Sequence, residues 1–475
     1  SKIIKNQVKL KDKRIKLEVD KYVQMMVVNR CVDPLSKLGA TRWLERTCYK
    51  EMTGYKQLDF DVTYFYRSMD HLLSVKDDLE LAIFEKLKDL FSVNVKLTFY
   101  DITSSYFYTD NCEIGENGYS RDNRPDRQQI VIGVVTSFEG YPIKHYVFEG
   151  NRKDETTVKD VVKQLKSEYN IEDTTFVGDR GMITKLNLTR LEGEGFQYIM
   201  GVKHRQDEIC SMLLSEQVHK EDHQLYSGLK IRERRVTVKE FLIWKCQKII
   251  REQKPDLAVE EFSLLREEIL SLNNKSEPES RDYKHIVESI IKGIDKPAYN
   301  KLFRGIKKYQ GRYENELRYI ICLNEERKAS SHSKRQVQIA KLSEQLDKVF
   351  AQNTRHKEDR DIDKAINKIF EGYKVKFKKF FTILRDSKYQ KATGYSLNQQ
   401  KIEQEKKFDG IFVLLSSRYD LKPCEVVESY KNLKEVEMLF DDLKNFVDIR
   451  PIRHCLQVRV RAHVFICVLA LLLKR

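Results

Sequence analysis

A chain of 475 residues, 41% of them hydrophobic and 33% charged, is long enough for two or three domains and for at least one sizeable core. Its formal net charge of +15 favours a polyanionic partner, because cationic side chains that neutralise phosphates release counterions. The nine cysteines include no Cys-x-x-Cys pair, which argues against a zinc site and a disulfide framework, so we expect reduced thiols. The apolar run at residues 464–473 is too short to span a bilayer, which argues against a membrane protein.

The first 94 residues show helical periodicity and few strand signals. Apolar side chains recur at helical spacing, for example at Val23, Met26 and Val27, and Asp33-Pro34 marks a helix boundary. A lysine-rich all-α module fits a DNA-binding head, although a plain helical support domain explains the periodicity equally well. The first residue is not methionine and the chain ends within an apolar helix, so we expect a fragment of a longer reading frame.

The pattern changes at residue 96, where an α/β domain is predicted to begin. Buried strands are expected at residues 96–103, 129–136, 141–148, 174–178 and 196–202, with helices near residues 158–169 and 186–191. The short turn at residues 137–140 predicts a hairpin. Three meandering strands followed by helix, strand, helix and strand match an RNase H-like mixed sheet flanked by helices.

A large insertion interrupts this order. Residues 204–407 are charged and mainly helical, with strands expected near residues 317–323 and 380–384. A buried strand at residues 410–415 resumes the core, and a helix over residues 426–444 follows. We therefore predict four parts: a helical N-terminal head (1–94), a first core part (95–203), the insertion (204–407) and a second core part with a C-terminal helix (408–475).

Three carboxylates stand out from their apolar surroundings. Asp101 and Asp179 are placed at the ends of two predicted buried strands, where ligands bind in such sheets. Glu437 lies on the apolar stripe of the 426–444 helix, which should face inward. A buried carboxylate is costly unless it is paired or binds a metal. Three acids that converge from two strands and a helix would make an oxygen-only site suited to Mg²⁺.

At these residues the chain resembles a DDE transposase of the bacterial insertion-sequence type, with an RNase H-like catalytic core. The stretch Tyr100-Asp101-Ile102-Thr103-Ser104 resembles the first-Asp motif of that family, and residues 177–182 resemble the second. Tyr430, Glu437 and Lys444 resemble the family signature Tyr-x2-Arg-x3-Glu-x6-Lys. Leu433 stands in the place of the Arg, a departure that concerns the phosphate contact of that position. The resemblance covers nearly the whole chain.

The resemblance implies a metal-dependent reaction on DNA. Asp101, Asp179 and Glu437 would hold two Mg²⁺ or Mn²⁺ ions, one to activate water or a 3′-hydroxyl and the other to stabilise the leaving oxygen. Hydrolysis at the ends of the element would free 3′-hydroxyls that attack target DNA, with no covalent protein–DNA intermediate. The implied partners are double-stranded DNA, at terminal inverted repeats and at the target, and a second copy in a homodimeric synaptic complex.

Several cations are candidates for DNA contacts. The resemblance places Tyr430 and Lys444 beside the scissile phosphates, and Arg180 follows the second Asp. Two segments that interleave cations with aromatic residues suit phosphate neutralisation and base stacking, although solvated amphipathic elements are a commoner explanation. Their candidates are Lys307, Lys308, Lys376 and Lys378.

A few further residues carry weaker signals. Arg450, Arg453, Arg459 and Arg461 are candidates for a phosphate-facing patch beside the active site. His454 and His463 are not at metal-ligand spacing with any cysteine, and we interpret them as satisfied helix residues. Trp244 has apolar neighbours, so we expect a core residue more than a base-stacking one.

Two alternatives to an active transposase stay open. A catalytically silent, truncated remnant would bind DNA without cutting it, and the unusual chain ends favour this reading somewhat. A host RNase H-like nuclease is disfavoured by the long insertion before Glu437. The expected location is the bacterial cytoplasm, in association with the nucleoid.

Overall fold

The computed structural model describes residues 1–12, 16–55, 58–91, 96–169, 174–182, 184–215, 224–253, 316–351, 359–387 and 391–475. These residues form two compact units. The first joins Ser1–Val202 with Leu414–Arg475, and the second is Lys203–Val413. Lys307 and Lys308 lie outside the described residues. Among the helices that are described, none combines the length and apolar character needed to cross a membrane.

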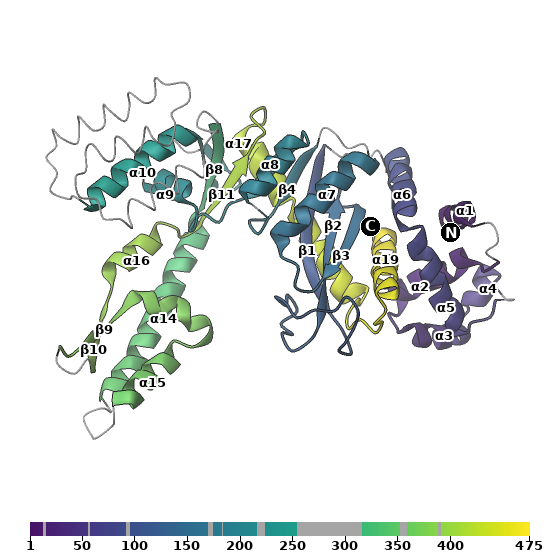
Figure 1. Ribbon diagram of the computed structural model, residues 1–475, viewed down its shortest axis with the longest axis horizontal. Helices are drawn as coiled ribbons and strands as arrows, with labels where there is room; N and C mark the ends of the chain where they lie inside the picture. The colour runs from purple at the N-terminus through teal and green to yellow at the C-terminus, as the bar shows by residue number, and fades with distance from the viewer. Residues whose placement is uncertain are drawn as a thin grey trace. The chain divides into compact units, whose positions relative to one another are not determined.

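A mixed sheet forms the centre of the first unit (Figure 1). Its strands follow the order β3-β2-β1-β4-β5-β11. β1, β2 and β3 pair antiparallel, β1 pairs parallel with β4 and β4 with β5, and β11 returns antiparallel to β5. The sequence prediction of antiparallel strands leading into parallel ones is confirmed. The bounds are β1 (Leu97–Tyr106), β2 (Gln129–Thr136), β3 (Pro142–Glu149), β4 (Thr175–Gly178), β5 (Gln197–Gly201) and β11 (Ile411–Ser416).

Two helices connect the later strands of this sheet, as the apolar periodicity predicts. α7 (Asp154–Tyr169) joins β3 to β4, and α8 (Lys185–Gly193) joins β4 to β5. The buried residues of α7 recur at helical spacing and form the stripe that packs into the core. They are Thr157, Val158, Val161, Val162, Leu165 and Tyr169.

The N-terminal part of the first unit is helical, as predicted. Side chains of Ser36 and Asp61 cap two of its helices by accepting N–H bonds from Gly39 (3.0 Å) and Thr63 (2.7 Å). The helices are α1 (Lys2–Lys11), α2 (Val19–Val32), α3 (Lys37–Arg46), α4 (Tyr49–Thr53), α5 (Val62–Ser74) and α6 (Lys76–Phe91).

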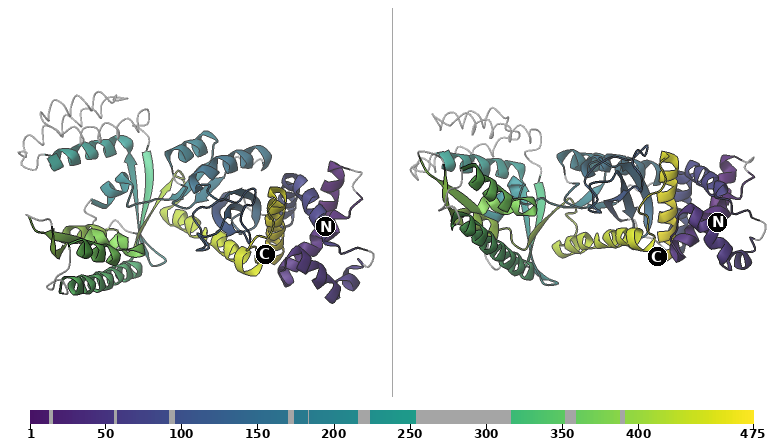
Figure 2. Two further views of the ribbon diagram at one scale, coloured as in Figure 1. Left: turned by 60° about the horizontal axis from the view of Figure 1, so that its bottom comes forward. Right: turned by 90° about the horizontal axis from the view of Figure 1, so that it is seen from below.

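The last helix unites this helical head with the sheet. α19 (Gln457–Lys474) is buried along most of its length and packs against α2, α5 and β3. Both views in Figure 2 show it between the sheet and the head. An apolar helix contacted on several faces belongs in a protein core, which explains the hydrophobic run near the chain end.

The helix expected over residues 426–444 is interrupted. α17 (Pro423–Lys431) ends in a turn, α18 (Lys434–Asp441) follows, and the last segment is a π-helical turn (Asp442–Phe446). Hydrogen bonds between residues three positions apart, as in a 3₁₀-helix, tighten the turn between α17 and α18. The N–H of Leu433 donates to the carbonyl of Tyr430, and the N–H of Val436 donates to the carbonyl of Leu433.

The second unit contains more strand than the sequence patterns indicate. Only β8 (Glu316–Asn324) and β9 (Phe381–Arg385) were expected, whereas β6 (Gln224–Tyr226), β7 (Leu229–Thr237) and β10 (Ala392–Leu397) are also present. β6 and β7 form a hairpin whose turn residues, Ser227 and Gly228, both have positive φ. β7 is rich in charged residues and its buried positions do not alternate, so it lacks the period-two pattern that predicts a strand.

Some of the helices of the second unit pack around an apolar core of their own. α14 runs beside α15 and the β9–β10 hairpin (Figure 1). Ile339, Leu342 and Leu346 of α14 meet residues from these neighbours in one buried cluster. The helices are α9 (Glu208–Ser215), α10 (Val238–Gln253), α14 (Glu325–Ala351), α15 (Asp359–Ile369), the 3₁₀ segment η4 (Gly372–Phe380) and α16 (Gln399–Lys406).

Candidate active site

Asp101 and Asp179 occupy neighbouring positions on two adjacent parallel strands. The pairing of β1 with β4 ends at Tyr100 opposite Gly178, and each aspartate is the next residue of its chain. Asp179 follows the end of β4, as predicted. The expectation that Asp101 ends its strand is wrong, since β1 continues to Tyr106 because β2 remains paired with it.

The electrostatic surroundings of Asp101 join the three acids. Burial raises the pKa of Asp101 to about 7. A hydrogen bond of 2.8 Å, which Oδ1 accepts from the N–H of Ile102, lowers this pKa and so opposes the effect of burial. The charges of Asp179 and Glu437 raise this pKa further, whereas the guanidinium of Arg121 lowers it. The carboxylates therefore lie close enough to repel one another.

Glu437 reaches this cluster from an exposed position, so its predicted inward orientation is wrong. Its side chain is exposed in the first turn of α18, whereas Val436, Leu439 and Phe440 are the buried residues of that helix. A solvent-facing carboxylate at the rim of the cluster has no burial cost and remains available to a ligand.

Tyr430 holds Asp179 across a long separation in the chain. Its hydroxyl donates to Oδ1 of Asp179 over 3.1 Å, between residues 251 positions apart. Burial and the charge of Asp179 raise the pKa of Tyr430, so the phenol stays protonated and donates. Gly201 of β5 permits this approach, because a Cβ there would collide with the Tyr430 hydroxyl.

Lys444 takes part in an internal ion pair. Its Nζ donates to Oδ1 of Asp122 over 2.8 Å, and Arg450 donates to the same oxygen. The Asp122 side chain is only 1% exposed, so two cations neutralise a buried carboxylate. Burial lowers the pKa of Lys444, against the opposing effect of Asp122. This ion pair joins the π-helical turn after α18 to the loop after β1.

Sequence reasoning missed Arg121 and Asp154. The Arg121 N–H donates to Oγ of Ser104 over 2.9 Å, and its guanidinium donates to both carboxylate oxygens of Asp154 at 2.9 and 3.0 Å. Asp154 is the first residue of α7, and its Oδ2 would lie 2.9 Å from a Cβ at Gly181. The only sequence signal for this arginine is its place in a polar loop after the first-Asp strand.

The remaining sequence candidates lie elsewhere. Arg180 is exposed directly after Asp179. Lys376 and Lys378 are exposed on η4 of the second unit, where Lys378 donates to Oδ1 of Asn367 over 3.4 Å. Trp244 is half-buried on α10 rather than fully in the core, and its ring stacks on Phe241 at 6.3 Å.

The chemistry of the acid cluster fits a divalent cation, although the side chains are spread. Within the described ranges, no three His, Cys, Asp or Glu side chains are gathered closely enough to hold an ion as they stand. The donor set contains only carboxylate oxygens, which hard cations prefer. Burial, and to a smaller extent the charges of Asp179 and Glu437, raises the pKa of Asp101, and a bound cation would favour its ionised form.

Comparison with known proteins identifies the family. No curated protein matches the sequence. Among solved structures, a cryo-EM structure of the piggyBac transposase synaptic complex with hairpin DNA is similar, with 12% identity and a TM-score of 0.28 over 62% of this chain and 73% of that one. A family model described as transposase DDE domain matches residues 103–473, which include Asp179 and Glu437 and begin two residues after Asp101. Because this match covers most of the sequence, the chain belongs to the DDE-domain transposases.

Proposed function

We propose that this protein is a DNA transposase that hydrolyses phosphodiesters at the ends of an insertion sequence and joins the freed 3′-hydroxyls to target DNA. The observation that carries the proposal is the match of residues 103–473 to the transposase DDE domain. Burial is the largest cause of the raised pKa of Asp101, and a carboxyl enclosed beside two other acids is costly to keep without a role.

In this proposal Asp101, Asp179 and Glu437 are the carboxylates that would hold two Mg²⁺ or Mn²⁺ ions. A bound pair of such ions supplies Lewis acidity and an activated nucleophile. Tyr430 orients the carboxylate of Asp179 through its hydroxyl bond. Arg121, close enough to Asp101 to lower its pKa, favours the ionised form that a ligand requires.

The surface charge supports DNA as the substrate. A net charge of +15 and exposed Arg180, Lys376 and Lys378 suit phosphate contacts. Double-stranded DNA at the terminal inverted repeats and at the target, and a homodimeric synaptic complex, belong to the same proposal. Lys444 is a weaker candidate for a phosphate contact than its place in the signature indicates, because Asp122 already pairs with it.

The decisive experiment compares binding and nicking in one preparation. Asp179→Asn keeps the side-chain shape and removes a negative ligand, so metal-dependent nicking should collapse while binding to end DNA persists. Asp110→Asn, at an exposed position in the loop after β1, is the matched control and should nick normally. Equal loss of binding and nicking in Asp179→Asn would make Asp179 structural. A wild-type protein that binds but never nicks would instead be the silent remnant.

A further inference from the structure

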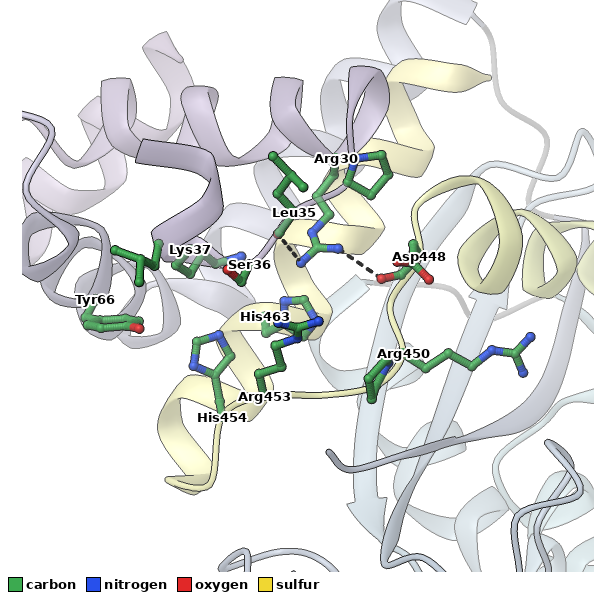
Figure 3. Close-up of a pocket in the computed structure, with 13 residues that line it drawn as sticks. Arg30, Leu35, Ser36, Lys37, Tyr66, Asp448, Arg450, Arg453, His454 and His463 are labelled. Carbon is green, nitrogen blue, oxygen red and sulfur yellow. Dashed lines mark hydrogen bonds between the residues drawn. The ribbon is translucent and has the colours of Figure 1, made fainter. Parts of the chain in front are cut away.

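A pocket of about 340 Å³ lies within the first unit, between the helical head and the segment that leads into α19 (Figure 3). The end of α2, the start of α3 and residues 448–454 form its walls. The side chains that concern its chemistry are Arg30, Lys37, Asp448, Arg453, His454 and His463. The lining is therefore cationic, with a single acid, Asp448.

Two buried cations of this pocket have no acidic partner. Lys37 is only 4% exposed and Arg30 only 7%. Arg30 donates to the backbone carbonyls of Asp448 (2.9 Å) and Leu35 (3.0 Å), and its Nε is buried without a partner. Within the part of the chain that the structure describes, Lys37 forms no ion pair and no side-chain hydrogen bond. Burial, then the charge of Arg30, lowers the pKa of Lys37 to about 7, and an anion in the pocket would favour its charged form.

Two histidines extend the polar lining and differ from the sequence expectation. His454 lies before α19 begins, and His463 is not satisfied. His463 is 3% exposed, and its Nδ1 has no partner among the described residues, while Nε2 lies 3.2 Å from the carbonyl of Ile449. The two rings are 5.5 Å apart. Burial, then the charges of Lys37 and Arg30, lowers the pKa of His454 to about 3, so this imidazole is neutral near pH 7.

The start of α3 adds backbone donors to the same pocket. Ser36, Lys37 and Leu38 line it, and the Ser36 hydroxyl caps the N–H of Gly39. The N–H groups of the first helical turn have no partner within the helix, and the helix dipole favours an anion there. Side-chain cations and a helix start therefore converge on one space.

We propose that this pocket binds a phosphate group of the DNA backbone. The inference rests on the function proposed above, since it concerns the same DNA. Of the four arginines near α19, Arg459 pairs with Asp70 and Arg461 donates to the carbonyl of Val147, whereas Arg453 is exposed at the pocket. The pocket thus has an exposed cation at its mouth and buried cations behind it.

A polar network connects the pocket with the active site. Arg450 lines the pocket, but its side chain extends away from the two histidines (Figure 3). It donates to the Asp122 oxygen that also accepts from Lys444, in the turn after the helix of Glu437. A phosphate in the pocket would therefore fix a DNA strand against the segment that supports the catalytic helix.

The test combines inorganic phosphate and duplex DNA. Thermal unfolding is measured in phosphate and in chloride at equal ionic strength, and DNA affinity is measured by anisotropy over a salt series with EDTA present. Lys37→Met removes the buried cation and keeps its apolar stem. Arg453→Gln removes the exposed cation at the opening of the pocket. Lys88→Met, which removes an exposed lysine of α6 outside the pocket, is the control.

Phosphate should raise the Tm of the wild type and of Lys88→Met but not of Lys37→Met. Lys37→Met should itself melt higher in chloride, which shows that it is folded. For both pocket variants the salt dependence of DNA binding should fall by about one unit of slope.

Three results would overturn the proposal. If phosphate does not stabilise the wild type, the pocket is not an anion site. If phosphate stabilises it while Lys37→Met and Arg453→Gln keep the full salt slope, the pocket takes free phosphate and not DNA. If Lys88→Met reduces the salt slope of DNA binding as much as Lys37→Met does, the reduction comes from the overall charge of the protein and not from the pocket. Metal-dependent nicking by the wild type, measured separately, distinguishes each of these from failure of the proposed function.

Discussion

At the scale of single residues, the hydroxyl of Tyr430 acts on the proposed chemistry through Asp179. It donates one 3.1 Å bond to that carboxylate. Tyr430→Phe removes the bond and keeps the ring, so cleavage should slow roughly 10- to 100-fold, the equivalent of about 1.5–3 kcal/mol for a hydrogen bond to a charged group. DNA affinity should not change. Single-turnover nicking at saturating DNA measures the effect.

A pair of glycines provides a control for this positioning role. Gly201→Ala should displace the Tyr430 ring and cause a similar loss, whereas Gly193→Ala should not, because a Cβ at Gly193 meets open space. Normal nicking by Gly201→Ala together with slow nicking by Tyr430→Phe would mean that the hydroxyl acts in some way other than by orienting Asp179.

The carboxyl of Asp101 is expected to make the proposed cation binding depend on pH. Burial raises its pKa to about 7 from 3.8, so between these values the folded protein keeps a proton that the unfolded chain has lost. This group therefore lowers folding stability as pH rises from about 4 to 7. A cation must displace the same proton, so Mn²⁺ affinity should rise as pH increases toward 7 and level off above it. Calorimetric titration at pH 6 and 8 measures the change. If the Mn²⁺ affinity of Asp101→Asn depends on pH as steeply as that of the wild type, the proton that the cation displaces belongs to another group.

At the scale of elements, one buried carboxylate joins two segments of the active site. Asp122, in the loop after β1, pairs with Lys444 and with Arg450. Asp122→Asn leaves two partly buried cations unpaired and should cost about 3–5 kcal/mol of unfolding free energy. Denaturant unfolding measures this cost, and Asp126→Asn in the same loop, which is exposed, should change stability far less.

The double variant Asp122→Asn/Lys444→Met checks the cause of that loss. Removing one of the stranded cations should restore part of the stability, because the cost belongs to unpaired charge and not to lost packing. If the double variant is no more stable than Asp122→Asn alone, the carboxylate supports the loop in another way.

At the scale of the whole molecule, we expect cleavage to depend on the first unit and DNA binding to depend partly on the second. The first contains the three acids, and the second has exposed cations on η4. Lys376→Glu/Lys378→Glu should weaken DNA binding and reduce its salt slope, by roughly one for each lost phosphate contact. Nicking at saturating DNA should survive. The matched control is Lys334→Glu/Lys341→Glu on exposed positions of α14. Equal effects from both pairs would assign the binding to overall charge.

Local sequence patterns were sufficient for most of the core. Strands β2, β4, β5 and β11 follow from short apolar runs, and α7 and α19 from helical spacing, because neighbouring residues in the chain decide these elements. Asp179 was identified at the end of its strand for the same reason. In the second unit β7 is rich in charge and its buried positions do not alternate, so local reasoning failed there.

By itself, the sequence determined the mixed α/β architecture, the helical head and the family resemblance, and it proposed the three acids. Only the tertiary structure decided how these residues are arranged. Strand register set Asp101 beside Asp179, packing left Glu437 exposed on α18, and packing of α2 and α3 beside residues 448–454 created the cationic pocket. These arrangements depend on register and side-chain packing between segments that are distant in the chain, which no local periodicity encodes.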